Sequence, residues 1–141
     1  MTSDATCPER RAFDAVPASA RAARQFVTDL LRLDGAPAAV ISDCSLVVSE
    51  LVTNVIEHGG GARLEVALDL ADPQWWRLEV IGTAPIAPTQ LRAPETWTLA
   101  GPNEVSGRGL GIVRQLMDDV VISAADDRVT VTCRRRRSGS W

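Results

Sequence analysis

The sequence predicts an α+β domain, a two-layer sandwich in which helices pack on one face of a mixed, mostly antiparallel sheet. Apolar residues recur at helical spacing in three segments, and they alternate in two pairs of segments joined by short turns. With 141 residues, the chain has room for one compact domain with its own core. A content of 45% hydrophobic and 23% charged residues is typical of globular proteins.

The N-terminal half is expected to hold one strand and two helices. Residues 1–8 are predicted to be a flexible arm, and a short strand follows at 10–15. Apolar or small residues spaced three and four apart predict a helix over 18–34, where an Asp-Gly pair ends it. A second helix is predicted over 37–58, because it carries a wide apolar stripe and three glycines close it.

Two hairpins and a third helix are expected in the C-terminal half. The alternating segments 63–70 and 75–81 predict the first hairpin, and 120–123 with 128–133 predict the second. Between them, the proline-rich residues 83–106 are predicted to be a functional or disordered loop. The glycine run 107–111 opens the third helix. The single domain is therefore expected to span 9–133, with a basic, solvated tail at 134–141.

Composition excludes several classes of protein. The net charge of −3 argues against a general nucleic-acid binder that neutralises phosphates. All fifteen basic residues are arginine, so neither a Schiff-base lysine nor a P-loop lysine is available. Three widely separated cysteines lack metal-ligand spacing and are expected to be buried or free thiols. No apolar run approaches the ~20 residues that span a bilayer, and early charges exclude a secretory signal. A cytoplasmic protein without a membrane partner is expected.

A polar stripe runs along the predicted second helix. Glu50 is followed by Asn54 four residues later and by Glu57 and His58 seven and eight residues later, so their side chains share one face. No arginine lies within 33–62 to pair with the carboxylates. Carboxylate and amide oxygens suit Mg²⁺, and a carboxylate beside such a site can act as a general base. A solvated helix face would show the same spacing, and a histidine at a helix end commonly interacts with the helix dipole.

A glycine-rich run precedes the predicted third helix. Glycines let backbone amides approach an anion closely, and the helix N-terminus attracts negative charge. The run consists of Gly107, Arg108, Gly109, Leu110 and Gly111, in which the arginine adds a charged donor. A flexible loop before a helix is the alternative interpretation. The run and the polar stripe together predict a site for a metal ion and a phosphate group.

These two segments resemble the motifs of a known superfamily. SELVTNVIEHG at 49–59 resembles the N-box of the GHKL, or histidine-kinase-like, ATPases and kinases, and GRGLGIVRQLMDDV at 107–120 resembles their G2 box. The short chain and the AARQFV segment of its first helix are most similar to the small bacterial anti-sigma-factor serine kinases. The resemblance covers roughly residues 13–133.

The resemblance implies a Bergerat-type sandwich that holds ATP between the helices, beneath a lid formed by 83–106. It implies that Asn54 ligates Mg²⁺ and that Glu50 is the general base that activates an acceptor serine. The expected nucleotide-binding residues are Asn54, His58, Gly82, Thr83, Gly107, Arg108, Gly109, Leu110, Gly111 and Thr130, the last near the adenine pocket.

One position departs from the family pattern. Gly82 stands where the G1 box has an aspartate that accepts a hydrogen bond from the adenine amino group. A hydrogen bond to a charged group contributes roughly 1.5–3 kcal/mol, so its loss would weaken binding about 10- to 150-fold. The Thr83 hydroxyl or a water molecule could replace it in part.

The sequence therefore supports two functions. The first is an anti-sigma-factor-like regulator that binds Mg-ATP and a sigma factor, and phosphorylates or binds an antagonist protein. The second is a nucleotide-independent, catalytically inactive binding module that keeps the same fold. Relatives of this type often form homodimers, and no direct contact with nucleic acid is expected.

Overall fold

Eight elements make up the part of the chain that the computed structural model describes, residues 8–58, 63–82, 105–125 and 128–137. At residues 58, 105–110 and 124–125 the description is limited to the backbone. The elements are β1 (Glu9–Asp14), α1 (Ala18–Leu33), α2 (Ala38–His58), β2 (Arg63–Asp69), β3 (Trp75–Gly82), α3 (Val105–Leu116), β4 (Asp119–Ala125) and β5 (Arg128–Arg136).

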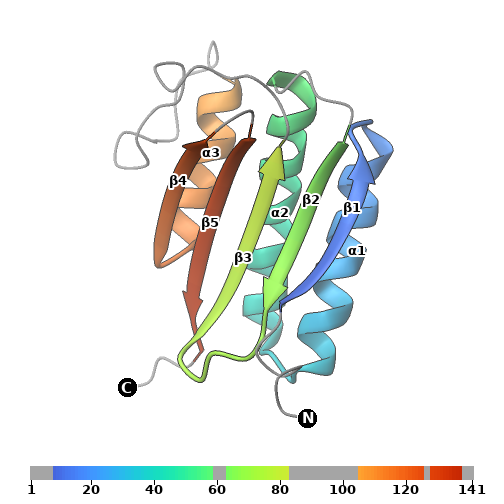
Figure 1. Cartoon of the computed structure of the whole chain (residues 1–141). Coiled ribbons are helices and arrows are strands. Elements are labelled where there is room, and N and C mark those ends of the chain that lie inside the picture. The colour runs from blue at the N-terminus through green and yellow to red at the C-terminus, as the bar shows by residue number, and fades with distance from the viewer. Residues whose placement is uncertain (1–7, 59–62, 83–104, 126–127, 138–141) are drawn as a thin grey trace.

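The strands form one five-stranded sheet in the order β1-β2-β3-β5-β4. All four pairings between these described strands are antiparallel. The prediction of a mixed sheet allowed some parallel pairs, but none occurs among these strands. The three helices cover the same face of the sheet (Figure 1). The predicted α+β architecture, with helices on one face, is therefore confirmed.

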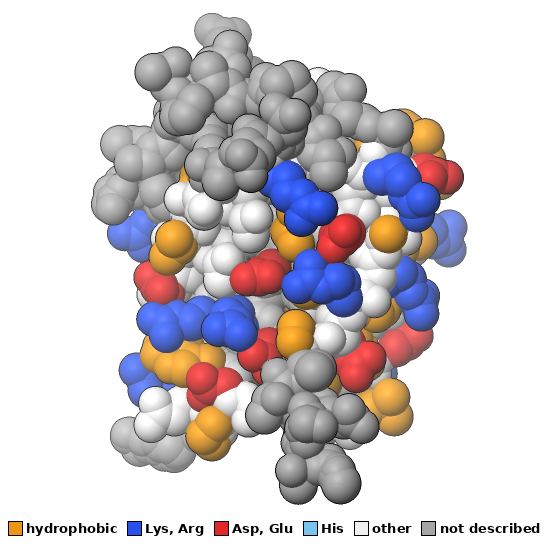
Figure 2. All heavy atoms as spheres, in the orientation of Figure 1, with side chains coloured by type: hydrophobic (Ala, Val, Ile, Leu, Met, Phe, Trp, Pro, Cys, Tyr) orange, Lys and Arg blue, Asp and Glu red, His pale blue; other side chains and the backbone are white. Residues whose placement is uncertain are grey.

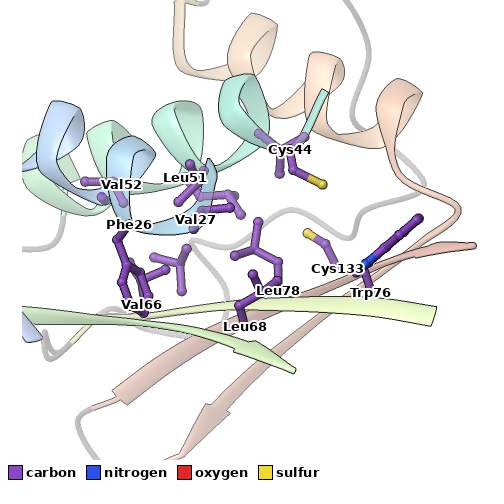
Figure 3. Close-up of a cluster of buried hydrophobic side chains, with 14 of the residues drawn as sticks. Phe26, Val27, Cys44, Leu51, Val52, Val66, Leu68, Trp76, Leu78 and Cys133 are labelled. Carbon is purple, nitrogen blue, oxygen red and sulfur yellow. The ribbon is translucent and has the colours of Figure 1, made fainter. Parts of the chain in front are cut away.

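The hydrophobic core fills the space between the helices and the sheet (Figure 3). The alternation predicted for β2 is confirmed, because Leu64, Val66 and Leu68 are fully buried. The adjacent tryptophans of β3 point to opposite faces. Trp76 is 4% exposed in the core, whereas Trp75 lies on the open face between the guanidinium groups of two β5 arginines, 4.3 and 4.6 Å from its ring centre.

Helix α2 is the central helix of the layer, packed against both α1 and α3. By length and composition alone, residues Ala38–Glu57 could cross a membrane, with a mean hydropathy of 1.6, which the sequence analysis did not expect. The apolar side of the helix is used in the core, where Val47, Val48, Leu51 and Val52 are buried. This burial is typical of a core helix.

The opposite face of the sheet carries charged side chains of both signs (Figure 2). Its ion pairs run between neighbouring strands, at 2.7–2.9 Å: Arg10–Glu65, Arg77–Asp69 and Arg134–Asp119. Most of these side chains are partly exposed, so each pair contributes little to stability.

The C-terminal arginines do not form the solvated tail that was predicted from residue 134. Strand β5 continues through Arg136, and Arg135 reaches the helix layer. Its guanidinium donates to the Asp43 carboxylate of α2 at 2.6 Å and to the Leu116 carbonyl of α3 at 2.9 Å. A run of like charges usually indicates a solvated segment. Here hydrogen-bond acceptors from distant parts of the sequence hold the Arg135 side chain against the helices.

Arg137 connects the end of β5 to the turn between β2 and β3 and to the end of α1. It donates to the carbonyls of Leu70 and Asp72, at 2.5 and 2.7 Å, and to the Asp34 carboxylate at 2.8 Å. The same carboxylate oxygen accepts the Trp76 indole N–H at 2.9 Å. Asp34 therefore ties the end of α1 to β3 and β5.

Two of the three cysteines lie in the core as free thiols, as expected; Cys7 lies outside the described residues. Cys44 of α2 and Cys133 of β5 are both buried, and their sulfur atoms point into the same part of the core (Figure 3). Burial raises the pKa of each thiol to about 12. Both are therefore neutral and unreactive at physiological pH.

Candidate functional site

The predicted polar stripe lies on one flank of α2. Glu50 and Asn54 are both half-buried and one helical turn apart, so their side chains lie on the same flank. Within the described part of the chain, no hydrogen bond or ion pair occupies either side chain. Their oxygens therefore have no protein partner there and can bind a ligand.

This flank of α2 faces α3. Asp43 precedes Glu50 by seven residues, or about two turns, and so lies on the same side of the helix. Because Asp43 and the Leu116 carbonyl share the guanidinium of Arg135, that side lies next to the last turn of α3. The two helices run in opposite directions (Figure 1). Glu50 and Asn54 therefore lie alongside the earlier residues of α3.

The glycine run forms the N-terminal half of α3. The helix begins at Val105, two residues before the predicted start, so Gly107, Gly109 and Gly111 occupy its first two turns. Only the first few N–H groups of a helix are free of intrahelical bonds. The amides that could bind a phosphate are therefore those before and at Gly107, while Gly109 and Gly111 lie within the regular helix. Gly111 is buried.

Gly82 ends β3 beneath α2. It is buried and pairs with Leu64 on one side and Val129 on the other. A Cβ atom at this position would lie 3.1 Å from Cγ1 and 3.3 Å from Cγ2 of Val55. The residue after Asn54 therefore fills the space that a side chain at position 82 would need. The sequence analysis did not identify Val55, because nothing in the local pattern indicates this contact.

Thr130 lies on the other face of the sheet. It pairs with Ile81 of β3 and Ser123 of β4. Side chains alternate along a strand, and Val131 packs against the core beneath the helices. The Thr130 side chain is therefore on the open face, and the structure does not bring it next to Glu50 and Asn54.

The remaining predicted site residues are only partly described. His58 is the last residue of α2, and Arg108 and Leu110 lie in α3; their side chains are outside the description. Thr83 and the predicted lid up to residue 104 also lie outside the described residues, while residues 105 and 106 already belong to α3.

The residues present fit a weakly held magnesium ion. Among the described residues, no group of three histidine, cysteine or acidic side chains could form an all-protein metal site. Mg²⁺ needs fewer protein ligands, since it commonly keeps several waters and binds one or two protein oxygens together with substrate phosphates. The half-buried Asn54 amide supplies such an oxygen next to the helix that carries the glycine run, and the Glu50 carboxylate lies one helical turn away.

Comparison with known proteins identifies the type of domain. The family model described as histidine kinase-like ATPase domain matches residues 13–135. No curated protein matches the sequence.

Three solved structures share the fold. The RsbU and RsbW domains of a Mycobacterium tuberculosis protein match with 22% identity and a TM-score of 0.62, over 93% of this chain and 32% of that one. The SiaB–SiaC complex of Pseudomonas aeruginosa matches with 11% identity and a TM-score of 0.67, over 96% and 93%. A blue-light activated histidine kinase domain from Erythrobacter litoralis matches with 16% identity and a TM-score of 0.57, over 89% and 62%. The chain spans about a third of the M. tuberculosis chain.

Proposed function

Because the chain belongs to the histidine kinase-like ATPase domain family, we propose that it is an anti-sigma-factor-like regulator with a serine kinase type of ATP site. In this proposal, Mg-ATP binds between α2 and α3, and the acceptor is a serine of a small antagonist protein. A sigma factor is the other binding partner. The protein acts in the cytoplasm, as a homodimer.

The observation that supports a kinase is that Glu50 and Asn54 lie together on one flank of α2. Both are half-buried on the flank of α2 that faces α3, and no described residue pairs with them. A binding module has no need of an unpaired carboxylate and amide at such a place, since unpartnered polar groups that are partly buried reduce stability. A kinase needs both.

Each residue has a distinct part in the proposed reaction. Asn54 would hold Mg²⁺, which neutralises charge on the transferring phosphate when it is bound. Glu50 would accept the proton of the serine hydroxyl as its oxygen bonds to the γ-phosphorus and the bond to ADP breaks. The free amides at the start of α3, up to Gly107, would bind phosphate oxygens. Gly82 and Thr83 would lie at the base end of the site, and His58, Arg108 and Leu110 around the nucleotide.

The arrangement of the solved neighbours is consistent with a protein partner. The RsbW domain of M. tuberculosis shares its chain with an RsbU domain, and SiaB was solved together with SiaC. These partners belong to those proteins, and they support the class of partner proposed here.

The proposal is tested by comparing nucleotide binding with phosphate transfer. Purified protein is titrated with Mg-ATP by calorimetry, and transfer from labelled ATP to candidate antagonist proteins of the same genome is measured. Glu50→Gln is expected to keep ATP affinity and to lower transfer by about 10²- to 10⁴-fold, the usual contribution of a general base. Asn54→Ala is expected to weaken Mg-ATP binding itself.

Glu79→Gln is the matched control, because Glu79 is a half-buried carboxylate on the opposite face of the sheet, where it accepts a bond from Thr132. It should change neither binding nor transfer. Equal transfer by native protein and Glu50→Gln would contradict the assigned role of Glu50.

A second candidate function is favoured by one observation. The contact of Val55 with Gly82 fills the place where the resemblance expects a base-binding carboxylate, which favours a regulatory module that binds its protein partner without nucleotide. For this module, Glu50→Ala should leave partner affinity unchanged, and calorimetry should detect no ATP binding by the native protein.

A further inference from the structure

We propose that Val55 and Gly82 act as a pair that removes base recognition from the site, and that Val55 is a specificity-determining residue. This inference rests on the proposed function, which places a nucleotide against α2. It goes further by stating which nucleotides the site accepts: it should not distinguish adenine from guanine nucleotides.

The first step of the argument is steric. The side-chain direction at position 82 points toward α2, since Leu78 and Val80 of the same strand face are buried in the core. A Cβ there would meet both methyl groups of Val55, at 3.1 and 3.3 Å from its carbon atoms. A side chain at position 82 would therefore fit only if the Val55 side chain moved away by a few tenths of an ångström.

The second step concerns polarity. The three atoms nearest to a Cβ at position 82 are all side-chain carbons of Val55, so the immediate surroundings of that position are apolar. Gly82 has neighbouring strands on both sides, β2 at Leu64 and β5 at Val129, so both edges of its backbone face the sheet. None of these nearest atoms is an acceptor for the adenine amino group. An apolar wall discriminates weakly between ligands that differ by one polar group.

The third step is that the two residues are coupled. Gly82→Asp alone would force the new Cβ against Val55, so the strand end or α2 would have to shift. Val55→Ala removes both methyl groups that the Cβ would meet. We therefore expect the two changes together to restore a base-binding carboxylate with less strain than Gly82→Asp alone.

The experiment measures selectivity and stability in four proteins: native, Val55→Ala, Gly82→Asp and the double variant. Each is titrated with Mg-ATP, Mg-GTP and Mg-tripolyphosphate by calorimetry, and each is melted. The native protein should bind ATP and GTP within about threefold of each other, and the double variant should prefer ATP by about tenfold or more, the value of one hydrogen bond to a carboxylate. Gly82→Asp alone should melt below the double variant.

Val120→Ala combined with Gly82→Asp is the matched control. Val120 is a partly buried core valine of β4, paired with Cys133 and remote from Gly82. Its truncation should not recover the melting temperature of Gly82→Asp. If the double variant fails to fold, Val55→Ala with Gly82→Asn carries a neutral acceptor to the same place and is tested in the same way.

The outcomes separate this inference from the proposed function. A native protein that prefers ATP over GTP by tenfold would overturn the inference and leave the kinase intact. If the native protein binds no nucleotide but the double variant binds ATP, the coupling of the two residues holds, while the selectivity inferred here and the kinase function both fail. No binding by any variant would overturn both. A Gly82→Asp protein that melts as high as the double variant would refute the coupling of the two residues.

Discussion

Replacing Asp34 with alanine is expected to destabilise the fold by about 1–4 kcal/mol, although Asp34 belongs to no site. Its Oδ2 accepts both the Trp76 indole N–H and the Arg137 guanidinium. Trp76 is 4% exposed, so its N–H would be left buried without a partner, at a cost of about 1–3 kcal/mol. The lost ion pair, with side chains 21% and 23% exposed, adds up to about 1 kcal/mol.

The assay is chemical denaturation followed by tryptophan fluorescence, together with thermal melting. At this chain length a loss of 1 kcal/mol lowers the melting temperature by roughly 4 °C, so a decrease of about 4–16 °C is expected. Asp29→Ala is the control on the same helix. Asp29 is exposed and pairs with Arg32 at 3.5 Å, so its loss should cost under about 0.5 kcal/mol.

A double-mutant cycle with Trp76→Phe tests the assigned cause. Phenylalanine has no N–H to leave unpaired, so Asp34→Ala should cost about 1–2 kcal/mol less in that background than in the native protein. An equal cost in both backgrounds, or a loss under about 1 kcal/mol for Asp34→Ala alone, would refute the reasoning.

Two further predictions concern the core. The raised pKa of about 12 at Cys44 and Cys133 means that unfolding releases protons from these thiols above about pH 9, so their contribution to stability should be constant below pH 9 and fall between pH 9 and 12. The chain has no lysine or tyrosine, the other side chains that titrate at about pH 10. Replacing both cysteines with alanine should therefore reduce the loss of stability between pH 8 and pH 10.5, measured by chemical denaturation at both values. An unchanged loss would contradict its assignment to the thiols. Leu78 is a core residue that is 1% exposed, so Leu78→Ala should lower the free energy of unfolding by about 2–5 kcal/mol. Leu33 is 86% exposed, so Leu33→Ala should change it by less than about 0.5 kcal/mol. Equal losses for the two variants in urea denaturation would argue against the packing described.

Features that depend on neighbours along the chain could be predicted from the sequence. The apolar stripe of α2 and the alternation of Leu64, Val66 and Leu68 each follow from burying one face of an element. The placement of Glu50 and Asn54 on one flank follows from helical spacing alone. These features needed no knowledge of which elements meet.

Features that depend on contacts between distant elements could not be predicted. The partners of Arg135 and Arg137 are 19 to 103 residues away, so the arginine run looked like a solvated tail. The side of the sheet on which Thr130 lies depends on strand register, which a shift of one residue would reverse. The role of Val55 depends on the end of β3 passing beneath it.

The strand order has a consequence for synthesis of the protein. Strand β5 follows β4 in the sequence, yet it lies between β3 and β4 in the interior of the sheet. On the ribosome, β1, β2 and β3 can pair early, but β3 keeps an unpaired edge until residues 128–136 have emerged. Such an edge attracts strands from other chains. The nascent chain is therefore most prone to aggregate after β3 has emerged and before β5 follows, when most of the core residues are made but the strand that pairs with both β3 and β4 is missing.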